Sequence, residues 1–416
     1  GVTGNRPDYE YLHYARYSSF GTSYIDIPAI KPSSLQLTDL KWERSTSYNL
    51  GVDLSLFDWR YRLVANVYHR RTDDLLFKDQ SIPSSTGFGS ISYINGGTMD
   101  NDGWEIEFST NNMIKRGDWS VDLSLNFSNY VNTIIDLDEN VLHNYNADFN
   151  YSNGSYLNRF QVNNSFGSIY GFRYKGVYQY DTYQPDKPDA TAPVVRDANG
   201  NVVLDGSGDP IPMYFAYGTT NEYRFRGGDA IYEDINHELD IVYLGNSNPK
   251  FDGGFGTTIR WKRLSLNVFF NYRVGGKIIN YGRMYSESMY NTENQSVSTN
   301  WRWRKEGDVT DMPRAVYNQG YNWLASDRYV EDGSFLRVKY ITLRYRFPSN
   351  WVKRIGMTNL SAYLTVNNLW CFTKYSGVDP EISICTDTAK DYYGIAVDNS
   401  MTPRAKEWTF GLSATF

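Results

Sequence analysis

The residue types that most often carry out catalysis are sparse in this chain of 416 residues. Four histidines are present, and none has the spacing of a metal ligand. They are His13, His69, His143 and His237. The carboxylates Glu105 and Glu107 come closest to an acid–base pair, but no other reactive group converges on them. The chain has no G-x-S-x-G, H-E-x-x-H or phosphate-loop pattern. We therefore expect no catalytic residue, no metal site, no cofactor and no enzymatic activity.

Two cysteines and one basic-aromatic stretch leave alternatives open. Cys371 and Cys385 have no pair of histidines nearby for zinc, and they form either one disulfide or two thiols. The stretch from Trp301 to Lys305 (WRWRK) either stacks on sugars or a partner, or packs against neighbouring loops, and we favour packing. Tyrosine-rich loops suit carbohydrate and peptide equally. No substrate-binding residue can be named.

The composition is typical of a β-barrel in lipid. Aromatic residues make up 16% of the chain, with 36 Tyr and 11 Trp, although the mean hydropathy is −0.55. A barrel explains this combination because alternate residues meet lipid, the lumen is polar, and Tyr and Trp gather at the interfaces. The chain has no run of 18 apolar residues, so the sequence predicts no transmembrane helix. The net charge of −6 provides no basic surface for nucleic acid.

Strict alternation of apolar and polar residues predicts the strands. In residues 119–128, Trp, Val, Leu, Leu and Phe alternate with Ser, Asp, Ser, Asn and Ser. Similar segments predict about nine membrane-spanning strands, near 47–57, 60–70, 103–112, 119–130, 251–261, 264–275, 334–347, 358–371 and 405–416, with Gly1 to Asn5 as part of a tenth. A change of phase near Tyr340 indicates a bulge. A soluble β-sandwich also alternates, but its strands usually have about five to six residues.

Short and long connections alternate between these strands, which predicts their orientation. Outer-membrane barrels have short periplasmic turns and long extracellular loops. We therefore expect the C-terminus at Phe416 in the periplasm and residues 131–249 as one large extracellular excursion with internal β-structure. The strand-like segment 166–180 belongs to this excursion because a further spanning strand would reverse the parity. A closed barrel needs an even set of strands. We expect the sequence to be a fragment, or a second polypeptide to close the barrel.

Several motifs occur in an order that resembles the SusC/RagA family of TonB-dependent outer-membrane receptors of Bacteroidetes. They are residues 1–5 (GVTGN), 31–43 (KPSSLQLTDLKWE), 245–250 (GNSNPK), 331–339 (EDGSFLRVK), 367–369 (NNL), 372–377 (FTKYSG) and 403–404 (PR). The resemblance covers nearly the whole chain. It implies the C-terminal part of a barrel of about 22 strands with a plugged lumen. The plug, the TonB-contacting segment, the signal peptide and the early strands would precede Gly1, whose neighbourhood has no signal sequence of its own.

The resemblance also implies a function and partners. It indicates TonB-dependent active import of a nutrient, either an oligosaccharide or a peptide, across the bacterial outer membrane. The implied partners are a SusD-like surface lipoprotein, the TonB energy-coupling system and the outer-membrane lipid. A passive porin-like channel and a soluble extracellular glycan-binding β-protein are the alternatives. Members of the family often have an acidic calcium-like loop, but Asp234 to Asp240 lacks its central Asp-Gly, so calcium binding there stays open.

Overall fold

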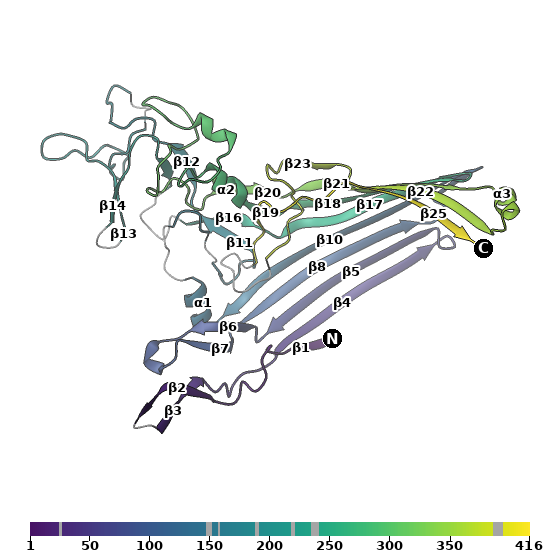
Figure 1. The fold of residues 1–416 in the computed structure, drawn as a ribbon, viewed down its shortest axis with the longest axis horizontal. Coiled ribbons are helices and arrows are strands. Elements are labelled where there is room, and N and C mark those ends of the chain that lie inside the picture. Colours follow the sequence, from purple (N-terminus) through teal and green to yellow (C-terminus); the bar gives the residue numbers. More distant parts are fainter. Residues whose placement is uncertain are drawn as a thin grey trace.

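One antiparallel sheet of 12 strands dominates the computed structural model (Figure 1). The structure describes residues 1–24, 27–146, 152–156, 159–187, 191–217, 221–233, 241–385 and 394–416. Ten strands follow one another across the sheet, and β9 (Ile114–Arg116) and β23 (Cys371–Thr373) pair beside them. In order, the ten are β1 (Val2–Asn5), β4 (Glu43–Leu56), β5 (Tyr61–Asp73), β8 (Gly97–Thr110), β10 (Trp119–Leu137), β17 (Pro249–Trp261), β18 (Leu264–Gly275), β21 (Phe335–Arg346), β22 (Asn359–Asn367) and β25 (Glu407–Thr415).

The predicted strands are therefore confirmed, with differences at their ends. Each of the nine predicted segments, and the segment at Gly1 to Asn5, contributes a strand to the main sheet. β10 continues to Leu137, whereas the alternation predicted an end near residue 130. β8 begins at Gly97 and not near residue 103, and the two extensions pair with each other. This pairing stabilises the end of β10 and the start of β8, where apolar and polar residues no longer alternate.

The register gives the sheet two chemically different faces. Residues opposite each other on adjacent strands project to the same side. Leu125 is opposite Phe108 on β8 and Phe255 on β17, whereas Asn126 is opposite Glu107 and Gly254. We name these sides the apolar face and the polar face. On the apolar face, side chains at the two edges of the sheet are open to the surroundings, with Leu50 exposed by 76% and Phe410 by 70%. So large an exposed apolar surface indicates contact with a partner or a membrane.

The bulge predicted near Tyr340 is confirmed. Phe269 pairs with Tyr340, and the next residue, Phe270, pairs with Val338. Lys339 is thus the extra residue on β21. The bulge returns Val338 to the apolar face after the phase of the alternation has changed.

Short and long connections lie at opposite ends of the sheet (Figure 1). The short ones are 57–60, 111–118, 262–263 and 347–358, of which the last contains α3 (Ser349–Arg354). Exposed aromatic side chains gather at this end, including Phe57, Trp59 and Trp351. The Trp119 and Trp261 rings stack there with centroids 5.5 Å apart. Such aromatic belts mark the level of lipid headgroups.

The remaining elements belong to the long connections. The two-stranded antiparallel sheets are β2 (Arg16–Tyr24) with β3 (Ile27–Ser34), β6 (Leu76–Ser81) with β7 (Ser90–Asn95), β11 (Ser168–Gly171) with β16 (Val242–Asn246), β12 (Tyr174–Val177) with β15 (Ala230–Tyr232), and β13 (Tyr214–Tyr217) with β14 (Asn221–Arg224). A three-stranded sheet joins β19 (Lys277–Asn280), β20 (Val330–Asp332) and β24 (Val397–Asp398). The helices are η1 (Ser84–Thr86), α1 (Glu139–Tyr145), α2 (Tyr281–Glu287), η3 (Val297–Trp301) and η4 (Asp327–Tyr329). Among the described residues, no helix is long and apolar enough to cross a membrane.

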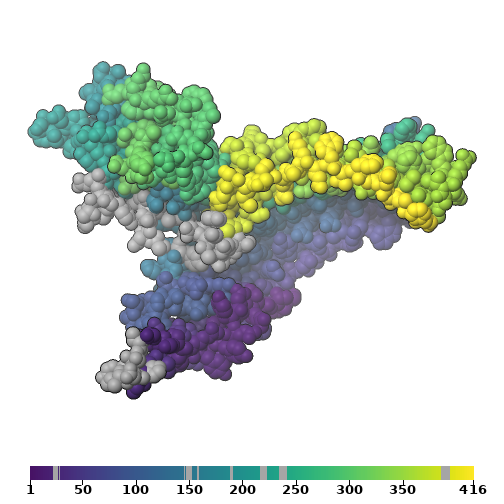
Figure 2. All heavy atoms as spheres, viewed as in Figure 1, coloured from purple at the N-terminus to yellow at the C-terminus, as the bar shows by residue number. Residues whose placement is uncertain are grey.

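The connections 138–248, 276–334 and 368–406 pack together, and we name their described residues the loop assembly. Its main core combines all three connections: Tyr156, Ile169, Ile279, Met284, Trp323, Ala325, Tyr329, Ile395 and Val397. Burial of one large apolar side chain contributes about 1.5–3 kcal/mol. That contribution offsets the entropy lost when such long connections are ordered. Figure 2 shows part of the assembly, in teal and green, as a lobe at one end of the sheet.

Candidate functional site

The polar face is the candidate functional surface, and several of its charged side chains form ion pairs between neighbouring strands. Arg62 on β5 forms an ion pair with Asp53 on β4 at 2.8 Å, and Arg260 on β17 pairs with Asp122 on β10. Ser128 donates a hydrogen bond to Asp252 at 2.8 Å. These contacts run between neighbouring strands. They produce a hydrophilic wall with charges of both signs.

Glu105 and Glu107 lie on this wall. They are two residues apart on β8, opposite Asn66 and Val64 of β5. Among the described residues, no group of three or more His, Cys, Asp or Glu side chains is placed to hold a metal ion. The arrangement fits a polar wall better than an acid–base site, because a catalytic pair needs further groups directed at a common substrate.

Aromatic rings lie flat against the same wall where the neighbouring strand has glycine. A Cβ atom added to Gly103 would come within 2.4 Å of the Tyr68 hydroxyl. The same relation holds between Gly254 and Phe269, and between Gly411 and Tyr363. The rings therefore occupy space that side chains would fill. This keeps the aromatic side chains of the polar face close to the sheet.

Part of the loop assembly folds onto the polar face through the Arg337 cluster, which consists of Arg337, Asp379, Glu381 and Arg404. Arg337 Nη2 donates a 2.5 Å hydrogen bond to Asp379 Oδ1, and Arg337 Nε lies 3.1 Å from Glu381 Oε2. Arg404 Nε lies 2.8 Å from the same Glu381 oxygen. The side chain of Arg337 is exposed by only 5%. Burial makes such ion pairs sensitive to the loss of one partner.

The described parts of 374–404, residues 374–385 and 394–404, therefore form what we name the strap across the end of the polar face. Besides the Arg337 cluster, Arg273 on β18 donates a hydrogen bond to the Ile382 carbonyl at 3.1 Å. On β10, Asn132 accepts hydrogen bonds from Ser165 Oγ and Phe166 N at 2.5 and 2.8 Å. Two separate connections thus turn back over the polar face. Both narrow the space beside it at the end with the long connections.

A second ionic cluster fixes the strap to the rest of the loop assembly. Arg283 contacts Glu287 at 3.0 Å and Glu331 at 3.2 Å. Glu331 also accepts hydrogen bonds from Ser376 Oγ and Asn280 Nδ2. Burial alone would raise the pKa of Glu331, but the bonds from Ser376, Arg283 and Asn280 hold this pKa below its usual value. Glu331 therefore stays ionised at neutral pH and connects 276–333 with the strap.

The basic-aromatic stretch is divided between the two alternatives. Trp303 packs: its Nε1 donates to the Gln179 carbonyl at 3.0 Å, and its ring covers Gly228. Arg302 and Arg304 donate to carbonyls of their own loop, at Thr299 and Asn300. Trp301 is 68% exposed. Trp303 thus packs against neighbouring loops, as we favoured, whereas the Trp301 ring is exposed to the surroundings.

The other candidate residues do not converge. The structure has no disulfide between Cys371 and Cys385, and Cys371 is a free thiol. His69 lies on the apolar face beside Asp102, and His143 lies in α1. The acidic segment from Asp234 to Asp240, which includes His237, lies outside the described residues. The contacts of Arg337 and Asn132 with the folded-back connections had no recognisable signal in the sequence, because their partners are 33 or more residues away.

Comparisons with known proteins agree with this architecture. Residues 3–228 match the family model described as TonB dependent receptor-like, beta-barrel. TonB-dependent receptor P3 of Formosa agariphila is 29% identical over 100% of this chain and 38% of its own length. TonB-dependent receptor SusC of Bacteroides thetaiotaomicron is 25% identical over 100% of this chain and 37% of its own length. The solved structure of the RagAB peptide transporter, at 24% identity, matches all of this chain and 40% of its own with a TM-score of 0.70.

The fold, its two faces and these comparisons therefore define part of a transmembrane β-barrel of the receptor class. The chain belongs to the TonB-dependent receptor β-barrel family. The resemblance to SusC and RagA receptors is confirmed, and the family implies an outer-membrane location. The chain spans about 38% of the length of the curated relatives described above. In the described residues, β1 and β25 are the ends of the path of strands and do not pair with each other.

Proposed function

We propose that this chain forms part of the barrel of a receptor that actively imports a nutrient across the outer membrane, together with a SusD-like surface lipoprotein. The main support is membership of the TonB-dependent receptor family. Two structural features also support the proposal. The polar face is a hydrophilic wall, and the loop assembly at one end of the sheet folds onto this face. In this proposal the wall borders the route of the substrate, and energy comes from the TonB system. The chain acts in transport and not in catalysis.

The substrate is an oligosaccharide or a peptide. The RagAB structure is described as that of a peptide transporter, which favours a peptide. Exposed tyrosines in the connections, such as Tyr214 and Tyr317, present rings that suit either class. We therefore propose active import of one of these two substrate classes, and the uptake of each is measured.

Uptake by intact cells tests active import. We expect cells with the complete receptor to take up labelled oligosaccharide or labelled oligopeptide, and expect deletion of its gene to abolish the uptake of one of them. Uptake should also stop when the proton gradient is collapsed, because TonB-coupled transport needs energy. Uptake that persists without the gradient would identify a passive channel. Unchanged uptake of both substrates after deletion would contradict the proposed function.

We also propose that the long connections, including residues 131–249, are extracellular and that the short turns and Phe416 are periplasmic. The basis is the alternation of short and long connections, which in outer-membrane barrels follows this orientation. Cysteine labelling tests it in a receptor in which Cys371 and Cys385 are replaced by serine. Ser207 and Asn350 are exposed residues of a long and a short connection, respectively.

We expect a membrane-impermeant maleimide to label Ser207→Cys in intact cells, and Asn350→Cys after the outer membrane has been permeabilised. Each variant serves as the control for the other, because the two positions lie at opposite ends of the sheet. Labelling of Asn350→Cys alone in intact cells would reverse the proposed orientation.

A further inference from the structure

A cavity of about 130 Å³ lies at the end of the sheet with the long connections, under residues 160–166, which turn back over the polar face. Its lining is mostly apolar and includes Leu76, Met99, Ile134, Leu137, Phe160 and Phe166. The main sheet contributes Met99 on β8 and Ile134 on β10, which are opposite each other in the register. The cavity therefore lies between the sheet and the folded-back segment.

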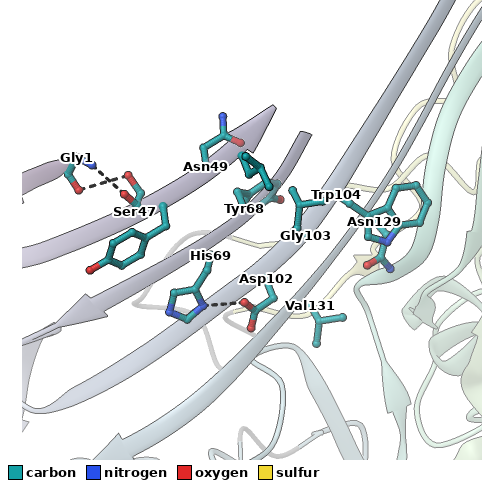
Figure 3. Close-up of a pocket in the computed structure, with 13 residues that line it drawn as sticks. Gly1, Ser47, Asn49, Tyr68, His69, Asp102, Gly103, Trp104, Asn129 and Val131 are labelled. Atoms are coloured by element: carbon teal, nitrogen blue, oxygen red, sulfur yellow. Dashed lines mark hydrogen bonds and ion pairs between the residues drawn. The ribbon is translucent and has the colours of Figure 1, made fainter. Parts of the chain in front are cut away.

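The register places this cavity on the side of the polar face. Successive residues of a strand project to opposite sides of a sheet. Figure 3 shows the contact between His69 of β5 and Asp102 of β8, which belong to the apolar face. Met99 is three residues from Asp102 on the same strand, so it projects to the polar face, as does Ile134 opposite it. The cavity thus lies beside the wall that borders the proposed route of the substrate.

Hydrogen bonds hold the segment that covers the cavity. Ile134 N donates to the Asn164 carbonyl at 3.0 Å, and Asn163 N donates to the Ile134 carbonyl at 2.7 Å. Further along the segment, Phe160 N donates to Asn146 Oδ1 and Asn146 Nδ2 donates to the Phe160 carbonyl, both at 2.9 Å. Ile134 and Phe160 are almost fully buried. Because the walls are already ordered, a ligand binds there without the entropic cost of ordering them.

The polar residues of the lining are engaged within the protein. Glu43 accepts hydrogen bonds from the Leu76 amide at 2.9 Å and from Asn5 Nδ2 at 2.8 Å. Lys78 forms an ion pair with Asp8. A sugar buried here would lose the hydrogen bonds of its hydroxyl groups to water, which is unfavourable, whereas an apolar group has none to lose. Since an apolar cavity of about 150 Å³ accepts benzene, the volume suits one side chain of up to the size of phenylalanine.

We propose that the cavity binds one apolar side chain of a peptide substrate, of the size of leucine, methionine or phenylalanine. The inference rests on the proposed import and narrows its substrate to peptides. Leu76 and Met99 are only half-buried, so this part of the lining is accessible to a ligand. Burial of the apolar side chain drives its binding. The peptide backbone stays at the polar face, where side chains satisfy its hydrogen bonds.

A random pentapeptide library tests the inference on the purified full-length receptor, and mass spectrometry identifies the peptides that the receptor retains. Leu76→Trp fills the cavity. Leu204→Trp is the matched control, because Leu204 is an exposed leucine of a long connection and does not line the cavity. We expect peptides with leucine, methionine or phenylalanine to be enriched about tenfold, as is usual for a hydrophobic pocket. Leu204→Trp should keep this enrichment and Leu76→Trp should lose it.

Met99→Ala provides an independent measurement if Leu76→Trp folds poorly. It enlarges the cavity and leaves the hydrogen bonds of the covering segment in place. We expect it to shift the preference about tenfold toward peptides with tryptophan, because the larger side chain then fits. Retention of no peptide, or retention without a preference for apolar residues, by the unmodified receptor would overturn the inference. So would identical behaviour of Leu76→Trp and Leu204→Trp, or an unchanged preference in Met99→Ala.

Uptake by cells separates this inference from the proposed function. Gradient-dependent uptake of labelled oligosaccharide but not of labelled peptide would overturn the assignment of the cavity and leave active import in place. Gradient-dependent uptake of peptide that Leu76→Trp does not change would have the same meaning. Absence of gradient-dependent uptake of both substrates would contradict active import itself.

Discussion

Replacing Arg337 by alanine in the full-length receptor is expected to destabilise the folded protein by about 3–5 kcal/mol, the usual effect of removing one partner from a buried ion pair. The side chains of Asp379 and Glu381 are exposed by 11% and 17%. Without Arg337, Asp379 loses its cation and Glu381 loses one of its cations, while both carboxylates remain shielded from water. Glu381 keeps Arg404 at 2.8 Å, but Asp379 keeps only backbone donors among the described residues, the amides of Glu381 and Arg404.

The effect is measured by urea titration of the receptor in lipid vesicles and by limited proteolysis of residues 374–404. The strap is expected to become cleavable because the Arg337 cluster holds it on the polar face. Arg344→Ala is the matched control. Arg344 lies on the same strand and the same face, is exposed, and contacts the Tyr363 ring at 5.6 Å. Its loss is expected to cost about 1 kcal/mol or less.

Arg337→Lys separates charge from geometry. Lysine restores one positive charge, but a single ammonium group cannot match the planar guanidinium that reaches both Asp379 and Glu381. An intermediate stability is therefore expected. If Arg337→Ala and Arg344→Ala have the same stability and the same proteolysis pattern, the buried ion pairs do not hold the strap in place.

The strands could be predicted because lipid and lumen impose opposite chemistry on alternate residues. In 119–128 this constraint acts on every residue, so both the strand and its faces are visible in the sequence. The bulge at Lys339 was visible for the same reason, since an extra residue changes the phase of the alternation. Beyond Tyr130 the constraint weakens. There β10 continues through a register shift between Ile134 and Asp136, and its pairing with β8 maintains the strand.

The loop assembly could not be predicted because its contacts join residues far apart in the chain. Arg314 reaches Asp229, a fully buried carboxylate 85 residues away, at 2.6 Å. Tyr156 donates to the Ser326 carbonyl across 170 residues. Neither pair follows a periodicity. The segment 168–177 shows where the limit lies. The parity of the connections predicted that it adds no strand to the main sheet, but the pairing of β11 with β16 and of β12 with β15 depends on tertiary contacts that the sequence does not reveal.

Leu125→Arg is expected to destabilise the barrel by about 2–4 kcal/mol, the range found for arginine on the lipid side near the middle of a bilayer. Leu125 lies midway along the part of β10 that pairs on both sides, between Phe108 and Phe255 on the apolar face. A guanidinium there has no partner in hydrocarbon. Urea titration in lipid vesicles, together with the yield of assembled receptor in the outer membrane, measures the effect.

The matched control is the adjacent residue on the same strand. Asn126→Arg adds the same charge and volume on the polar face, opposite Glu107 and Gly254, where Glu107 can pair with the new cation. We expect its cost to be about 1 kcal/mol or less. The difference between the two variants isolates the environment, because strand, depth and new side chain are the same. Equal costs, or a larger cost for Asn126→Arg, would show that the apolar face does not meet lipid, and the membrane orientation of the whole sheet would then be wrong.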